Sequence, residues 1–198
     1  MGTRGAVGVK LNNKYYVTYN HWDSYPSELG KDVVQFCQKI DTIQNGWKKF
    51  SKNIEKVELV KNKDKASKKL QNKYAKYCDE SVSTQDSSEW YCLLRNLQGI
   101  SIFNEILEGN VEHMIDSFNF LKDSLFCEYA YIINLDDKKL EFYQGFNKSV
   151  DTNSPLPIEQ ISKNDYYPVK FVGSVNFEDI EDFDVEKIEN NSVLMWSK

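Results

Sequence analysis

The sequence has few of the residues on which the commonest metal, redox and membrane signals depend. It contains two histidines, four cysteines and four prolines in 198 residues. The cysteines form no C-x-x-C pair, so neither a zinc ribbon nor a disulfide framework is predicted. No run of about 18 apolar residues is present, as a membrane-spanning helix would require. We therefore predict no metal, no cofactor and no membrane span.

Positive charge is not in excess either. The chain carries 25 Lys and Arg against 30 Asp and Glu, a formal net charge of −5 at pH 7, so nucleic acid is not a favoured partner. Cys37 and Cys92 lie inside apolar patterns, where cysteine behaves as a small buried hydrophobe. Free thiols, together with an opening that lacks the pattern of a secretory leader, predict a cytoplasmic protein. Nothing in the sequence indicates an oligomeric state.

A folded core is indicated by a hydrophobic fraction of 40% and an aromatic fraction of 14%. The length suits a single domain spanning residues 1–198. Alternating residues predict strands over 5–11 and 14–19, joined as an antiparallel hairpin by Asn12-Asn13. Further strands are expected over 127–133, 140–145 and 166–173, with helical spacing between them. The helices are expected over 33–40, 47–57, 61–76, 90–97, 102–107 and 110–118, and a short helix or turn within 176–191.

Strands at both ends and helices in the middle predict an α+β fold, with antiparallel hairpins packed against a central helical segment. Within it, residues 48–76 contain eleven lysines against three acidic residues. This helical excursion, at about 48–80, is interpreted as a solvated or mobile surface. The alternative, a patch for polyanions, is less favoured because the segment lacks the arginines that grip phosphate with two hydrogen bonds.

Residues 19–30 are the strongest candidate for a functional site. They place a histidine, an aspartate, two serines and three aromatic residues next to the first hairpin. Counting outward from Asn12-Asn13, Arg4 lies opposite Asn20 or His21. The candidate catalytic residues are Arg4, His21 and Asp23. The candidate ligand-binding residues are Thr3, Asn20, Trp22, Ser24 and Tyr25.

Thr3-Arg4-Gly5 and Tyr19-Asn-His-Trp-Asp-Ser-Tyr-Pro resemble the opening of a family of bacterial, fungal and viral proteins. The later segments 128–136 and 167–172 also resemble that family, and the resemblance implies no particular activity. The layout is similar to that of N-terminal-nucleophile hydrolases, which implies an αββα arrangement. Those enzymes begin with Ser, Thr or Cys, whose free amine is the base. Here removal of Met1 exposes Gly2, and Thr3 requires a further cleavage.

Three functions fit these residues. The first is a hydrolase of a small anionic metabolite, nucleotide or phosphorylated, with His21 as acid or base, Asp23 orienting it and Ser24 or Ser27 as nucleophile. The second is a non-catalytic module, viral for example, that sequesters a nucleotide signal: Arg4, Asn20 and His21 grip the phosphate while aromatic rings stack on the base. The third is a protein-interaction domain whose aromatic loop is the contact.

Overall fold

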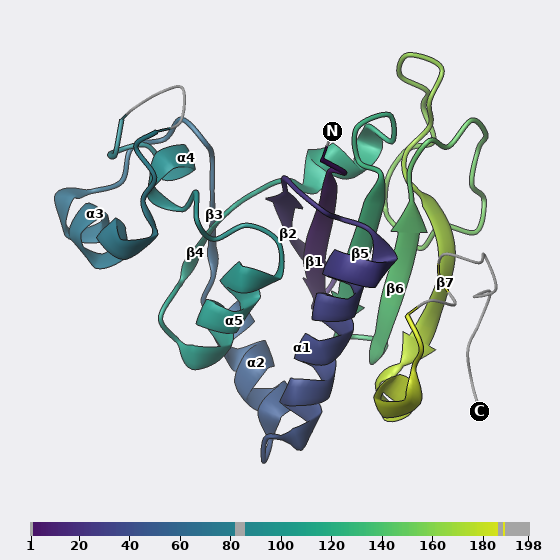
Figure 1. Ribbon diagram of the computed structural model, residues 1–198, viewed down its shortest axis with the longest axis horizontal. Helices are drawn as coiled ribbons and strands as arrows, with labels where there is room; N and C mark the ends of the chain where they lie inside the picture. Colours follow the sequence, from purple (N-terminus) through teal and green to yellow (C-terminus); the bar gives the residue numbers. More distant parts are fainter. Residues whose placement is uncertain (1, 82–85, 186–187, 189–198) are drawn as a thin grey trace.

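The computed structural model describes residues 2–81, 86–185 and 188 of the chain. Its centre is a five-stranded sheet in the order β2-β1-β5-β6-β7 (Figure 1). The sheet is mixed, because β1 is parallel to β5 while the other neighbouring pairs are antiparallel. A mixed sheet packed with helices confirms the α+β class. Its strands are β1 (Gly5–Leu11), β2 (Lys14–Asn20), β5 (Tyr129–Asn134), β6 (Lys139–Gln144) and β7 (Lys170–Asn176).

The two predicted hairpins, β1–β2 and β5–β6, both form. Asn12 and Asn13 make the first turn with φ of 53° and 58°, the left-handed region that asparagine tolerates and that primed turns require. Their backbone amides donate to the two carboxylate oxygens of Asp136 at 2.7 and 2.9 Å. This contact ties the first turn to the turn of the second hairpin. The parallel pairing of β1 with β5, which joins the hairpins into one sheet, was not predicted.

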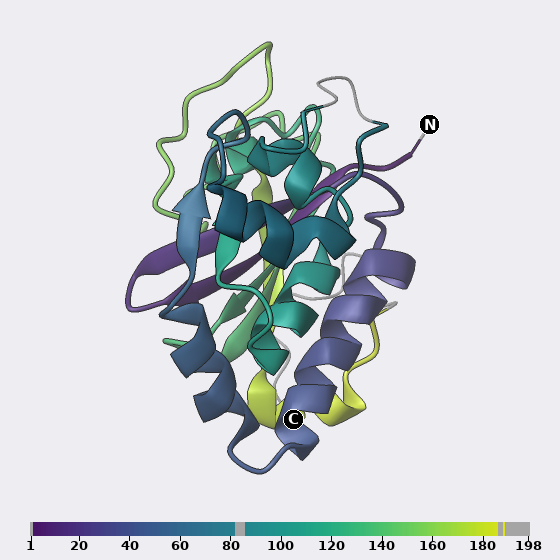
Figure 2. The same ribbon diagram turned by 90° about the vertical axis from the view of Figure 1, so that its left-hand side faces the viewer.

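Each face of the sheet carries its own hydrophobic cluster. On one face, strand residues such as Val7, Tyr131 and Phe142 pack against helices. Those helices are α1 (Lys31–Thr42), α2 (Gly46–Ile54) and α5 (Ile100–Glu108), which also pack on one another (Figure 2). The opposite face is covered by the turn η3 (Phe118–Lys122) and by the loop between β6 and β7. The residues of this second cluster are Ala6, Val17, Leu121, Cys127, Ala130, Ile132, Tyr143, Leu156, Ile158 and Val169.

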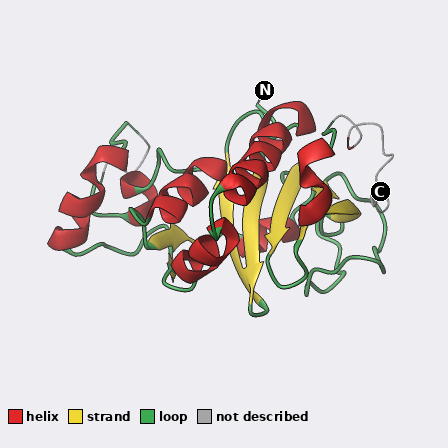
Figure 3. Ribbon diagram, turned by 90° about the horizontal axis from the view of Figure 1, so that it is seen from below, coloured by secondary structure: helices red, strands yellow, loops and turns green. Residues whose placement is uncertain are grey.

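A smaller lobe extends from the β2 edge of the sheet (Figures 1 and 3). It contains the parallel pair β3 (Glu58–Val60) and β4 (His113–Ile115), the helix α3 (Lys68–Tyr74), the turn η2 (Ala75–Tyr77) and the helix α4 (Trp90–Leu93). Its large aromatic residues Tyr74, Tyr77 and Trp90 are buried in the same cluster as the helices on the sheet. The lobe therefore shares a continuous core with the rest of the chain, while the single-domain organisation itself stays a prediction.

The predicted helix over 110–118 is wrong, and those over 61–76 and 90–97 are only partly helical, the second ending at Leu93. Residues 110–118 have apolar residues at helical spacing, but 113–115 form strand β4, because pairing with β3 satisfies this backbone and buries Met114. Of 61–76, only the part from Lys68 onward is helical, after β3 and an irregular loop. The last strand lies over Lys170–Asn176, later than expected, since Pro168 delays its start. The short helical turn expected near the tail is η4 (Phe177–Asp182), and 186–187 and 189–191 lie outside the described residues.

Candidate functional site

The loop that follows β2 is held by its own polar side chains. The Asn20 side-chain amide donates to the Trp22 carbonyl and, at 2.9 Å, to Ser24 Oγ. Ser24 N donates to the Thr3 carbonyl at 3.2 Å, and the Tyr131 hydroxyl donates to the Ser24 carbonyl at 3.0 Å. The chain then turns through η1 (Pro26–Gly30) directly into α1. Three of the predicted ligand-binding residues, Thr3, Asn20 and Ser24, thus hold the loop against the sheet.

Ser24 is fully buried, and its side chain packs on Gly5. An added Cβ at Gly5 would lie 2.5 Å from the Tyr129 carbonyl oxygen and 2.7 Å from Ser24 Cβ. Gly5 therefore permits a close approach of the Tyr129 backbone and of Ser24. Thr3 is also buried, at 2% exposure. A buried serine that accepts a hydrogen bond from an amide, and has none with His21, is not placed as an activated nucleophile.

Arg4, Tyr19 and His21 come together as the register predicts. Gly5 pairs with Asn20, so the next position outward sets Arg4 opposite His21, on the face that also carries Tyr19. The Tyr19 hydroxyl and His21 Nδ1 are 2.8 Å apart. The Arg4 guanidinium lies 4.7 Å from the ring centre of Phe126. Its positive charge also works to lower the pKa of the Tyr19 phenol.

A fourth residue, Arg95, joins this group from a distant part of the chain. Gly99 N donates to the Tyr19 carbonyl at 3.1 Å, which fixes the loop after α4 against the end of β2. The Arg95 guanidinium stands 5.5 Å from the ring centre of Tyr91. We call Arg4, Tyr19, His21 and Arg95 the arginine cluster.

The two guanidinium charges act on both titratable members of the arginine cluster. Burial lowers the pKa of His21, and the charges of Arg95 and then Arg4 lower it further. Burial raises the pKa of Tyr19, against the opposing effect of Arg4 and Arg95. His21 is therefore favoured as a neutral imidazole, with Nδ1 held by Tyr19. Its other ring nitrogen makes no hydrogen bond with the part of the chain that the structure describes.

Asp23 and the loop aromatics Trp22 and Tyr25 are all exposed, and Trp22 contacts the His21 ring. Asp23 is exposed, adopts φ of 50° and makes no hydrogen bond or ion pair with His21 among the described residues. Trp22 is 61% exposed, lies against Gly2 and meets the His21 ring edge-on at 4.3 Å. Tyr25 is 43% exposed, with its ring 6.0 Å from that of Tyr129. The structure thus joins Arg4 to His21, and it does not place Asp23 to orient the imidazole.

A cavity of about 420 Å³ opens beside the arginine cluster, and Tyr19 forms part of its wall. It lies between the β2 edge, the segment from α4 to α5, and the chain that follows β4. Tyr91 and Phe120 also line it, and the Phe120 ring meets Tyr19 edge-on at 5.1 Å. Leu94, Leu97, Ile102 and Ile115 supply its apolar surface. This volume lies in the range typical of small-molecule sites, about 300–1,000 Å³.

Reasoning from the sequence did not select Arg95 or any residue of this cavity except Tyr19. One signal for Arg95 was present: Arg4 and Arg95 are the only arginines in the chain, against 23 lysines. Arginine suits bidentate contacts with phosphate or carboxylate better than lysine does. The cavity residues carry no comparable local pattern, because they come from four separate segments.

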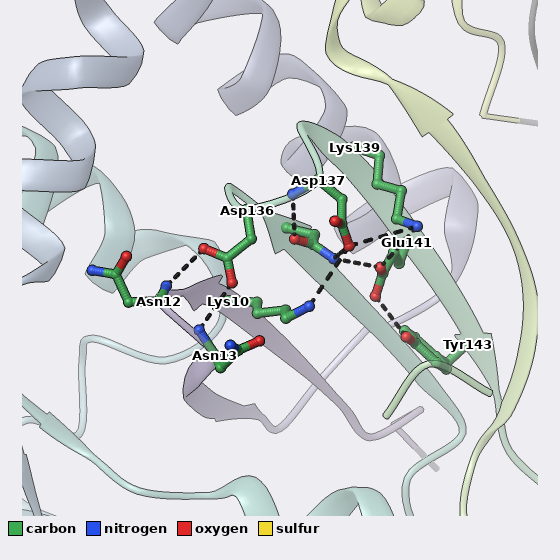
Figure 4. Close-up of polar contacts among 9 residues, drawn as sticks. Lys10, Asn12, Asn13, Asp136, Asp137, Lys139, Glu141 and Tyr143 are labelled. Carbon is green, nitrogen blue, oxygen red and sulfur yellow. Dashed lines mark hydrogen bonds and ion pairs between the residues drawn. The ribbon is translucent and has the colours of Figure 1, made fainter. Parts of the chain in front are cut away.

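A second polar cluster lies at the other end of β1 (Figure 4). The Glu141 side chain, 1% exposed, accepts hydrogen bonds from Asn134 at 2.7 Å and from the Tyr143 hydroxyl at 2.6 Å, and pairs with Lys139 at 3.6 Å. Burial, then the negative charge of Glu141, raises the pKa of Tyr143 well above its usual value. These hydrogen bonds join β5 to β6, so the cluster holds neighbouring strands together.

Among the described residues, no group of three or more His, Cys, Asp or Glu side chains is placed to hold a metal ion. In the same residues, no helix has the length and apolar character needed to cross a membrane. All four cysteines are free thiols, and Cys37, Cys92 and Cys127 are buried. Comparisons with protein-family models, curated proteins and solved structures found no match for this chain.

Proposed function

We propose that this protein binds a small anionic ligand at the arginine cluster. One observation carries the proposal: the charges of the only two arginines in the chain act on the same phenol and imidazole, and the ring of that phenol, Tyr19, lines a cavity of about 420 Å³. Positive charges that act on the same groups add their attraction for an anion at that place. Guanidinium groups and an imidazole N–H are also strong donors to phosphate or carboxylate oxygens.

The absence of carboxylate partners for the two arginines, among the described residues, supports the proposal. Neither forms an ion pair with a carboxylate among the residues that the structure describes; each faces an aromatic ring instead, Phe126 for Arg4 and Tyr91 for Arg95. Asp79 is the carboxylate to consider beside Arg95, but it accepts hydrogen bonds from Ser81. These hydrogen bonds lower the pKa of Asp79 most, and the charge of Arg95 lowers it least. Both guanidinium groups therefore keep donors for a ligand.

Hydrolysis of the ligand is the second candidate, and one observation favours it. With Nδ1 held by Tyr19, His21 is oriented and neutral, as a general base would be. Among the described residues, the hydroxyl in hydrogen-bonding reach of His21 is that of Tyr19, whose pKa is raised by burial, so a water molecule would have to serve as the nucleophile. Binding without turnover needs no nucleophile, and it is the function that we favour. An αββα arrangement like that of N-terminal-nucleophile hydrolases stays a prediction, and buried Thr3 offers it little support.

The test is calorimetric titration with inorganic pyrophosphate, inorganic phosphate and a dicarboxylate. We expect saturable binding that Arg4→Gln and Arg95→Gln each weaken about 10-fold or more, since a hydrogen bond to a charged group contributes roughly 1.5–3 kcal/mol. Lys69→Gln, which removes one exposed positive charge from the lysine-rich segment, is the matched control and should bind normally.

Failure of every anion to bind, or unchanged binding in both arginine variants, would contradict the proposal. Phosphorus NMR of the same mixtures with organic phosphates separates the two candidates. Release of inorganic phosphate by wild type but not by His21→Asn would establish hydrolysis instead of simple binding.

A further inference from the structure

The cavity beside the arginine cluster has polar groups that the protein itself does not use. Asn62, Gln98 and Asn119 line it, and the side-chain amides of these three residues make no hydrogen bond within the described part of the chain. Asn62 lies in the loop after β3, Gln98 lies before α5, and Asn119 lies in η3. Three segments distant in sequence therefore present the same chemical group to one space.

A carboxamide offers a donor and an acceptor side by side, which matches the edge of a nucleobase. Asn and Gln read adenine in this way through two hydrogen bonds. Aromatic side chains add the complementary contact, because a base can stack on or pack edge-on against Tyr19, Tyr91 and Phe120. The cavity thus combines planar apolar walls with donor–acceptor pairs, and this combination suits a heterocycle better than an aliphatic chain.

Asp116 adds one acceptor to the cavity. Its Oδ1 accepts a hydrogen bond from Phe118 N at 3.0 Å, and its second oxygen is left for a ligand. Carboxylates in nucleotide sites typically accept from ribose hydroxyls. A carboxylate would repel a phosphate in the same position, so the charged end of the ligand belongs at the arginine cluster.

We propose that the anionic ligand is a nucleotide, with its base and ribose in the cavity and its phosphate against Arg4, His21 and Arg95. This inference rests on the proposed function, and it adds the ligand class and the residues that read the base. Tyr19 connects the two parts, because its ring forms cavity wall while its hydroxyl holds His21. The exposed Lys61 and Lys63, on either side of Asn62, add positive charge near this site.

The test compares ligands that differ only in the base. Ribose 5-phosphate and the 5′-monophosphates of adenosine, guanosine, cytidine and uridine are titrated into wild-type protein by calorimetry. We expect at least one nucleotide to bind about 10-fold or more tightly than ribose 5-phosphate. A stacked base contributes roughly 1–3 kcal/mol, which is a 5- to 150-fold change in affinity.

Two variants test whether the base binds in the cavity. Asn119→Trp, at an exposed position of the cavity rim, should fill the space and reduce the nucleotide's affinity to that of ribose 5-phosphate. Gln98→Ala should reduce discrimination among the four bases, and both variants should bind inorganic pyrophosphate normally. Gln35→Ala, an exposed carboxamide on α1 outside this cavity, is the control and should change neither property.

The outcomes separate the inference from the function on which it rests. If pyrophosphate and ribose 5-phosphate bind as tightly as every nucleotide, the base is not recognised and the inference fails while anion binding stands. If nucleotides bind selectively but Asn119→Trp leaves their advantage intact, the base lies elsewhere and the inference also fails. If no anion binds, both proposals fail together.

Discussion

The two histidines of the chain sit in different surroundings, although burial lowers the pKa of each. His21 lies at the arginine cluster, where the charges of Arg95 and Arg4 add to the effect of burial. His113 lies in the lobe, stacked on Trp90 with ring centres 4.9 Å apart and with Nδ1 2.9 Å from the Tyr74 hydroxyl. It is half-buried and lies in strand β4, within the segment 110–118 that was predicted to be helical.

His113 should make the protein less stable in mild acid. Its pKa is lowered by burial first and by Lys73, against the raising effects of Glu58 and Glu112. The unfolded chain then binds more protons than the folded one as pH falls. Stability from His113 is complete above an unfolded pKa of about 6.5 and declines below it until the folded pKa is passed. Urea unfolding at pH 7.5 and 5.5 measures the loss in wild type.

The variant His113→Asn keeps an acceptor near the position of Nδ1 and removes the titration. It should lose less free energy of unfolding between the two pH values than wild type does. His21→Asn, tested in the same way, should remove a smaller part, because His21 is less buried. An identical pH dependence in wild type and His113→Asn would show that His113 does not titrate differently on folding.

Strand β6 carries a buried polar residue, Glu141, that joins it to its neighbouring strand. Glu141 points to the face that carries Ile132 and Tyr143, and its neighbours supply donors from β5 and β6. Lys10 on β1 pairs with Asp137 at 3.6 Å, and Asp137 N donates to the Asn134 side chain (Figure 4). The network therefore links three adjacent strands at the end of the sheet away from the arginine cluster.

Removal of the Glu141 carboxyl should be among the costly single changes in the sheet. Glu141→Ala leaves the buried Tyr143 hydroxyl without its acceptor and the Asn134 amide with Asp137 as its remaining acceptor, and we expect a loss of roughly 2–4 kcal/mol in the free energy of unfolding. Glu141→Gln keeps the shape and one acceptor and should lose less. Glu178→Ala, at an exposed position, should stay within about 0.5 kcal/mol. Chemical denaturation that ranks Glu141→Ala with Glu178→Ala would contradict this role.

Stability should be unevenly distributed over the whole molecule. In the lysine-rich segment, residues 61–69 are exposed apart from Ala66, whereas Tyr74 and Tyr77 anchor the part that follows. In contrast, four of the five residues of 90–94 are at most 4% exposed. Segment 61–76 is therefore not uniformly exposed, and its predicted mobility stays a prediction.

Hydrogen exchange should be faster over 61–69 than over 90–94, because local opening is easiest where few apolar contacts must be broken. Mass spectrometry of peptic fragments measures both segments in one experiment. Residues 70–77 should fall between them. Equal protection of 61–69 and 90–94 would mean that the lysines cover a packed surface.

Local patterns were enough to predict the features of this protein that depend on neighbouring residues. The first hairpin and its register follow from alternation and from Asn12-Asn13, and that register brings Arg4 to His21 across a short separation. The α5 helix follows from its apolar stripe and from Gly109 at its end. The misassigned segment 110–118 has a helical pattern too, but pairing with a strand more than fifty residues away outweighed it.

The tertiary structure decided whatever depends on long-range contacts. The parallel pairing of β1 with β5 joins segments 124 residues apart and leaves no mark in either strand alone. The charge of Arg95 acts on His21 together with that of Arg4 only because the loop after α4 lies against the end of β2, where Gly99 N donates to the Tyr19 carbonyl. The cavity likewise exists only where separate segments converge. Sequence periodicity reports which face of an element is buried, whereas which elements meet is set by packing of the complete chain.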